Sequence, residues 1–276
     1  MIVADANLGF LARAREVWQY RRILRFFASK ALRSLYAKTH LGVWWIFIRR
    51  FIPLMVASFV FGSVMKIPSG GVPYFVFFLI GQIPWDCFDG PLIRGGRGIE
   101  VNRQLLTKLY IPRIILPLAQ MTAGVIDPVI DLIVLVGALV YYQVTADVWY
   151  VPWRPQLLAC VASVVVVLFL ALSLSLWTSV WQARARDVRF AVRYVLAFWL
   201  LFTPVLYPLS MVPPRFRWLM HLNPLTAPVE TFRWGMLAGT EHSWGWFGYT
   251  VCVAVALFLG GVWQFARAES ATMDKM

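Results

Sequence analysis

The chain has 276 residues, of which 60% are apolar and only 14% charged, and its mean hydropathy is +0.68. Soluble domains usually carry about 25% charged residues. This composition therefore excludes a soluble domain and indicates a polytopic membrane protein. The net charge of +13 does not predict nucleic-acid binding, because the basic residues are concentrated in short segments between apolar stretches.

Six apolar stretches predict six membrane spans. They lie near residues 44–65, 74–93, 111–142, 155–181, 190–208 and 244–265. The segments on the side of the two termini hold 21 of the 26 Lys and Arg residues, and the opposite side holds 5. Short basic loops stay in the cytoplasm, so we expect both termini in the cytoplasm. No apolar stretch precedes Arg13 and Arg15, so we do not expect a cleaved signal peptide.

The segments define an all-α protein in three parts. We expect a cytoplasmic N-terminal segment (1–43), a transmembrane domain (44–266) and a cytoplasmic tail (267–276). In the first part, residues 21–38 have the pattern of an amphipathic helix. Its apolar face contains Ile23, Leu24 and Phe27, and its basic face contains Arg21, Arg22 and Arg25. Such a helix lies in the membrane interface, either as an anchor on anionic lipid or as a helix that also borders a partner protein.

Charged residues occur inside the apolar stretches, where they are energetically costly and normally face the protein interior. They are Arg49 and Arg50 in the first stretch, Asp86 and Asp89 in the second, and Asp127 and Asp131 in the third. The carboxylates are candidates for a proton relay, for the polar lining of a channel, or for ion pairs with Arg49, Arg50 or Arg94. We favour ion pairing or a polar lining, because no run of His, Lys or Glu completes a relay.

A short two-faced segment, residues 102–110, separates the second and third stretches. At about 100° per residue, Leu105, Leu106, Leu109 and Tyr110 lie on one side of a helix, and Arg103, Gln104, Thr107 and Lys108 on the other. A helix of this length is too short to cross a bilayer, which needs about 20 apolar residues. We predict that it lies at the cytosolic surface and presents its polar face to a soluble partner.

The region 203–239 is apolar but interrupted by many prolines, among them Pro204, Pro208 and Pro224. We expect two short helices, residues 214–222 and 228–238, that re-enter the outer leaflet. Asn223 and Pro224 form the turn between them, and Glu230 and Arg233 lie in the second helix. Irregular backbone at membrane depth must be buried in protein or line a wet cavity.

The chain lacks the motifs of an enzyme. No Lys follows a Gly, so a GxxxxGK[ST] phosphate loop is impossible. The three histidines and three cysteines are widely spaced and form no metal-ligand pattern. We therefore expect no catalytic residue, no metal and no cofactor on this chain.

Four stretches from Tyr36 to Leu237 resemble the permease subunits of type-2 ABC exporters, in particular the polysaccharide-export branch. They read YAKTHLGVW (36–44), NRQLLTKLYIPR (102–113), ARARDVRFAVRY (183–194), and TPVLYP with LNPLTAPVETFRWGML (203–208 and 222–237). Arg49 and Arg50 depart from this pattern, because uncharged residues are expected before Pro53.

The resemblance implies a homodimer that works with two copies of a separate P-loop ATPase, on which ATP and Mg²⁺ bind. The helix at 102–110 would be the coupling helix, assisted by the helix at 21–38. The substrate would be a lipid-linked polysaccharide, such as O-antigen on undecaprenyl diphosphate. Candidate residues for its channel or entrance are Phe75, Phe78, Trp85, Phe88, Arg94, Arg97, Asp127 and Asp131.

Three alternatives remain open at this point. The first is an exporter of drugs or small lipids from the same superfamily. The second is a membrane-embedded transferase that acts on the lipid carrier, for which Asp86 and Asp89 are the nearest candidates. The third is a proton-driven transporter, which requires the pair Asp127 and Asp131 to titrate and is usually built from inverted repeats; we find no such repeat.

Overall fold

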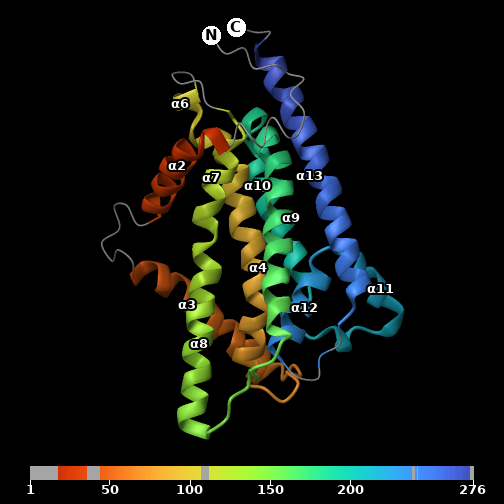
Figure 1. The fold of residues 1–276 in the computed structure, drawn as a ribbon. Coiled ribbons are helices and arrows are strands. Elements are labelled where there is room, and N and C mark those ends of the chain that lie inside the picture. Colours follow the sequence, from red (N-terminus) through yellow and green to blue (C-terminus); the bar gives the residue numbers. More distant parts are fainter. Residues whose placement is uncertain (1–17, 36–43, 107–111, 238–239, 241, 274–276) are drawn as a thin grey trace.

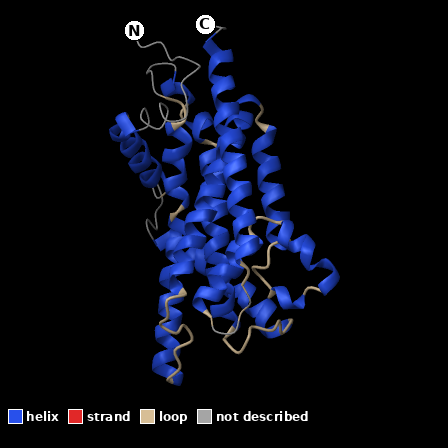
Figure 2. Ribbon diagram, turned by 45° about the vertical axis from the view of Figure 1, so that its right-hand side comes forward, coloured by secondary structure: helices blue, strands red, loops and turns tan. Residues whose placement is uncertain are grey.

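The computed structural model describes residues 18–35, 44–106, 112–237, 240 and 242–273. Within these ranges all regular structure is helical (Figures 1 and 2). The elements are α2 (Arg21–Ser34), α3 (Trp44–Ser58), the π-helix η1 (Phe59–Val64), α4 (Tyr74–Gly96), α5 (Gly98–Val101), α6 (Arg103–Leu106), α7 (Ile115–Gly124), α8 (Ile126–Ala146), α9 (Leu157–Arg184), α10 (Asp187–Leu201), the 3-10 turn η2 (Leu209–Met211), α11 (Pro214–Leu222), α12 (Thr226–Met236) and α13 (Trp244–Met273).

Helix α4 lies at the centre of the bundle. It packs against α3, α7, α8, α9, α10 and α12, and most of its residues are buried on all sides. A helix that is apolar all round belongs in a protein core or a membrane. Pro84 and Pro91 lie inside α4, and each removes one backbone N–H donor from the helix.

Four described helical segments are long and apolar enough to cross a bilayer: Phe47–Val64, Ile115–Ala146, Leu157–Arg184 and Trp244–Phe265. The chain is therefore a multi-pass membrane protein. The remaining two of the six expected spans correspond to α4 and α10. Helix α4 is interrupted by Asp86, Asp89 and Arg94, and α10 has only 15 residues, fewer than the roughly 20 that a complete crossing needs.

The third apolar stretch is broken near its middle. Helix α7 ends at Gly124 and α8 begins at Ile126, and together they form the single long segment Ile115–Ala146 that corresponds to the predicted third span. The break coincides with close backbone packing: a Cβ atom on Gly90 of α4 would lie 2.7 Å from the carbonyl oxygen of Gly124. Only glycine permits this approach.

Polar side chains connect the long helices α9 and α13. Ser173 donates a hydrogen bond to the Ala254 carbonyl (3.0 Å), and Trp177 Nε1 donates to the Leu257 carbonyl (2.8 Å). The hydroxyls of Ser175, Thr178 and Ser179 donate hydrogen bonds to backbone carbonyls within α9 itself. These buried groups are thus satisfied within the bundle, as the interior of a membrane protein requires.

The chain after α10 forms two short helices, as predicted. Helix α11 covers Pro214–Leu222, with Pro214 in its first turn, and α12 covers Thr226–Met236, two residues earlier than expected at each end. In Figure 1 they lie far from α6 and from the C-terminal end of α13. The fifth span was expected to reach Pro208, but α10 ends at Leu201 and the following residues form turns.

Candidate functional site: coupling surface, charge cluster and external loop

The segment between α4 and α7 is helical but not as one helix. Helix α5 ends at Val101, Asn102 forms a turn, and α6 covers Arg103–Leu106. The Asn102 side chain is buried and donates a hydrogen bond to the Gly98 carbonyl (2.9 Å). It therefore ends the first helical turn rather than beginning a longer helix. The sequence predicts one helix over residues 102–110. Arg103–Leu106 are helical as predicted, Asn102 forms a turn instead, and residues 107–110 lie outside the described part.

Two of the predicted polar residues of this segment, Arg103 and Gln104, are exposed at the surface. The other two, Thr107 and Lys108, lie outside the described residues. Arg103 and Gln104 are thus accessible to a soluble partner at the same end of the bundle as α2 (Figure 1).

The amphipathic helix α2 packs against its own chain. Phe27 on its apolar face is buried against Ile115, Leu116 and Ala119 of α7, and Ala31 on the same face is also buried. Its basic side chains, including the predicted Arg21, Arg22 and Arg25, are exposed. Helix α2 ends at Ser34, and residues 36–38 of the predicted helix lie outside the described part. Helix α7 is the next helix after the α5–α6 segment along the chain. Helix α2 therefore contacts the helix that directly follows this segment.

One ion pair connects the α5–α6 segment to α10. The Arg189 guanidinium lies 3.2 Å from the Glu100 carboxylate, and Arg97 lies 3.7 Å from the other carboxylate oxygen. The Glu100–Arg189 pair was not predicted, because the two residues are 89 positions apart and no spacing pattern connects them. The candidate entrance residues Arg94 and Arg97 lie at the end of α4 and in the turn after it, both partly buried.

Five of the six charged residues in the first three apolar stretches form ion pairs, as favoured from the sequence, whereas Asp89 forms none among the described residues. Arg49 donates to Asp127 at 2.7 Å. Arg50 contacts both oxygens of Asp131, at 2.9 and 2.7 Å, and also pairs with Asp86. We call these five residues the α3 ion-pair cluster. Asp131 is completely buried, and its carboxylate is compensated by the bidentate guanidinium of Arg50.

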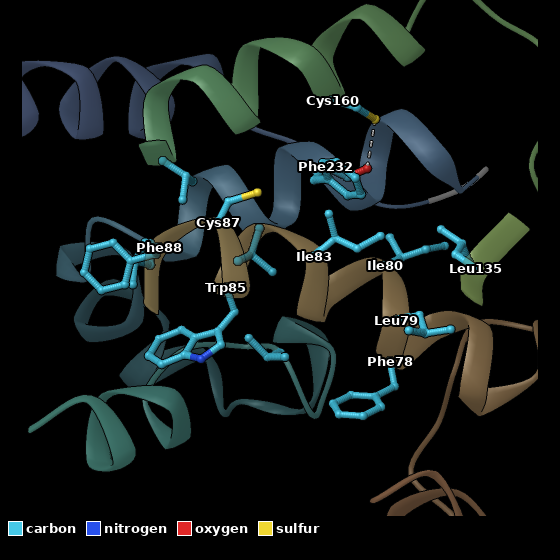
Figure 3. Close-up of a cluster of buried hydrophobic side chains, with 14 of the residues drawn as sticks. Phe78, Leu79, Ile80, Ile83, Trp85, Cys87, Phe88, Leu135, Cys160 and Phe232 are labelled. Atoms are coloured by element: carbon cyan, nitrogen blue, oxygen red, sulfur yellow. Dashed lines mark hydrogen bonds between the residues drawn. The ribbon is translucent and has the colours of Figure 1, made fainter. Parts of the chain in front are cut away.

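The aromatic residues proposed to line a passage lie mostly in the core of the described chain. Phe78, Trp85 and Phe88 of α4 are at most 4% exposed, and Phe75 is half-buried. Figure 3 shows these α4 side chains packed with apolar residues from neighbouring helices. The Phe88 ring stands edge-on to Trp199 of α10, with 5.3 Å between the centroids. Their contribution to a channel remains a prediction.

The external segment is held in place by Arg233. This side chain of α12 is 1% exposed. It donates to the carbonyls of Pro204, Val205 (2.6 Å) and Tyr207, and it pairs with Glu230 at 3.0 Å. Its guanidinium also lies over the ring of Phe77, 4.2 Å from the centroid. Arg233 thus satisfies carbonyl groups of the irregular chain that follows α10.

Asn223 makes a second set of bonds at the predicted turn before Pro224. Its amide oxygen accepts from Trp199 Nε1 (2.8 Å) and from the Leu225 N–H (3.0 Å). Its amide nitrogen donates to the Phe202 carbonyl and to the Thr203 hydroxyl. Asn223 therefore joins the end of α10 to the turn between α11 and α12. Pro208 immediately precedes η2.

Two residues outside the predicted set complete this external structure. Tyr74, at the start of α4, donates its hydroxyl to the Leu206 carbonyl (2.6 Å). Arg154, just before α9, donates to the Trp234 carbonyl (2.8 Å) and to the Leu237 carbonyl. The only signal in the sequence was that Arg154 is one of the few basic residues on the external side.

The described chain is thus a helical membrane bundle with a segment of short helices, α5 and α6, at one end and the pair of short helices α11 and α12 at the other (Figure 1). The family model for the ABC-2 type transporter matches residues 24–237. The chain belongs to this family.

The chain is similar over most of its length to three proteins named "O-antigen export system permease protein RfbA". The protein from Myxococcus xanthus is 28% identical over 222 residues, which cover 79% of this chain and 82% of the relative. One from Klebsiella pneumoniae is 26% identical over 234 residues, 85% and 84% of the two chains. A second from Klebsiella pneumoniae is 23% identical over 231 residues.

Proposed function

We propose that this protein is the membrane subunit of an ATP-driven exporter that moves a lipid-linked polysaccharide, such as O-antigen on undecaprenyl diphosphate, out of the cytoplasm. The observation that carries this proposal is the match to the ABC-2 type transporter family, together with relatives named as O-antigen export permeases over about four fifths of the chain. The expectation from the four sequence stretches agrees with it.

In this proposal the chain forms a homodimer in the bacterial inner membrane and crosses it six times, with α4 and α10 as the second and fifth spans. ATP and Mg²⁺ bind to two copies of a separate ATPase. The absence of any Gly-Lys sequence supports this division, since a phosphate loop requires that Lys. The exposed residues Arg103 and Gln104 form part of the ATPase-docking surface, and α2 assists.

The side-chain arrangement weighs against the two alternatives from other classes. A transferase would need several free polar groups at one membrane face. Of its two candidate carboxylates, Asp86 is paired with Arg50 and accepts a hydrogen bond from Gln82 (3.0 Å), so that only Asp89 is without an ion pair among the described residues. A proton-driven transporter would need a titrating Asp127–Asp131 pair, and both residues are paired with arginine. An exporter of drugs or small lipids would have this same fold, so only identification of the transported substrate distinguishes it from a polysaccharide exporter.

The proposal is tested by purifying the chain alone and together with the ABC-type ATPase subunits of the same organism. The chain alone is expected to hydrolyse no ATP, and the pair is expected to co-purify and to hydrolyse ATP. A stable complex with ATPase activity supports the exporter. Failure of any P-loop ATPase to bind contradicts it.

A further inference from the structure

Helix α3 makes few apolar contacts with the rest of its chain. Only 6% of the residues in the segment Phe47–Val64 are buried, and Leu54 is the buried apolar residue of α3. By comparison, 39% of the corresponding residues of α9 are buried. Apolar burial is therefore too small to fix the position of α3 against the bundle.

The ion pairs of the α3 cluster supply the missing contacts, and they are concentrated on one turn of α3. Arg49 reaches Asp127 of α8, while Arg50 reaches Asp131 of α8 and Asp86 of α4. Charged groups inside a membrane protein are costly without a partner. Separating α3 from α4 and α8 therefore requires that new partners, such as water or anions, reach these groups.

The other end of α3 continues into the π-helix η1 (Phe59–Val64). There Gly62 lies against Tyr74 of α4, so closely that a Cβ atom on Gly62 would be 2.7 Å from the Tyr74 Cβ. π-Helical turns are rare and interrupt the regular hydrogen bonding of an α-helix. Helix α3 is thus attached at two places, by close packing at η1 and by charge at Arg49 and Arg50.

We propose that Arg49 and Arg50 are positioning residues that hold the cytosolic half of α3 against α4 and α8, and that their ion pairs open during each transport cycle while the contact at η1 persists. The proposal rests on the proposed transport function.

A cleavable cross-link between α3 and α8 tests whether the ion pairs must open. The variant Arg49→Cys/Asp127→Cys is made with Cys252→Ser, because Cys252 is exposed while Cys87 and Cys160 are buried. It leaves Arg50 and its partners in place. A short bifunctional methanethiosulfonate reagent is expected to join the two cysteines and to stop export, and dithiothreitol is expected to restore it. The matched controls are the two single-cysteine variants treated identically, and the reagent should leave the export of each one at its own level before treatment.

Formation of the cross-link is read on a peptide map and does not depend on transport. No cross-link would overturn the proposed geometry, and a complete cross-link with undiminished export would overturn the proposed opening. A missing ATPase partner would instead contradict the transport function, so the two failures are distinguishable.

A second measurement keeps both arginines and is used if the double-cysteine variant lacks export before treatment. A cysteine at Leu54, which is 3% exposed, is reacted with a maleimide in the complex with and without ATP. We expect labelling at least about tenfold faster during ATP turnover, because buried sites react only when local structure opens. A cysteine at the buried Val167 of α9 is the control and should remain unlabelled. Equal rates at Leu54 with and without ATP would overturn the proposal.

Discussion

Arg189, in the first turn of α10, lies 3.2 Å from the carboxylate of Glu100 in α5. Residue Gly98 of the same short helix is packed against Pro117 of α7, where an added Cβ atom would meet the Pro117 nitrogen at 2.6 Å. The α5–α6 segment is therefore connected to α10 by charge and to α7 by close contact. A displacement of this segment by a bound ATPase would be transmitted to both helices.

Neutralising the ion pair is expected to reduce transport more than stability. Both side chains are 27% exposed, and pairs of this kind contribute about 0.2–1 kcal/mol. We expect Glu100→Gln or Arg189→Gln to lower polysaccharide export while ATP hydrolysis by the complex continues. The double variant Glu100→Arg/Arg189→Glu should recover part of the export. Normal export in both single variants would show that the pair transmits nothing.

Reversing the charge at Arg103 is expected to weaken binding of the ATPase. Arg103 is exposed at the end of the bundle proposed to face the cytosol, so Arg103→Glu should insert normally into the membrane but co-purify with less ATPase. The same change at Arg215, exposed on α11 at the other end, is the control and should leave the complex intact. Lys108→Glu should resemble Arg103→Glu. If co-purification is the same for all three variants, the docking surface lies elsewhere.

Removing the buried Arg233 guanidinium is expected to destabilise the fold. Arg233→Met leaves the carbonyls of Pro204 and Val205 and the carboxylate of Glu230 without this donor. Loss of one member of a buried ion pair costs about 3–5 kcal/mol, so the thermal unfolding temperature in detergent should fall markedly. Arg217→Met is the control, because Arg217 is less buried and bonds only the carbonyls of Val212 and Ser210. An equal, small decrease for both variants would contradict the role assigned to Arg233.

Because α4 closely approaches the break between α7 and α8, we expect the stability of the fold to depend strongly on the size of the side chain at Gly124. Gly124→Val places a side chain against the backbone of Gly90 and Pro91. Such overpacking typically costs about 1–3 kcal/mol. Gly137 of α8 provides the contrast, since an added Cβ atom there meets nothing within 4 Å, and Gly137→Ala should gain about 0.5–1 kcal/mol in a helix interior. Thermal unfolding of the two variants should therefore change in opposite directions.

Local patterns predicted the external helices well. Pro213 precedes α11, Pro214 begins it, and Asn223 and Pro224 follow it, so both ends of that helix were evident from these residues. The pairing of Arg49 and Arg50 with aspartates was also predictable, because buried charges in a membrane require partners. Which aspartate meets which arginine depends on the packing of α3, α4 and α8 and has no sequence signal.

Other features depend on contacts between distant residues and were missed for that reason. The helix break at Asn102 follows from its buried bond to the Gly98 carbonyl, whereas the periodicity of residues 102–110 alone favoured one helix. The bonds of Tyr74 and Arg154 to external carbonyls join residues more than 70 positions apart. The predicted lining residues Trp85 and Phe88 are packed inside the described chain, and apolar composition alone does not distinguish a core from a passage.

The most direct test of the proposed function is the fate of the lipid-linked polysaccharide in cells that lack this protein. We predict that a deletion strain accumulates undecaprenyl-diphosphate-linked polymer on the cytosolic face of the inner membrane and carries none at the surface. Export should return with the wild-type chain. It should not return with Arg103→Glu, if that variant fails to bind the ATPase. Normal surface polysaccharide in the deletion strain, without accumulated lipid-linked polymer, would contradict the assignment as a polysaccharide-export permease.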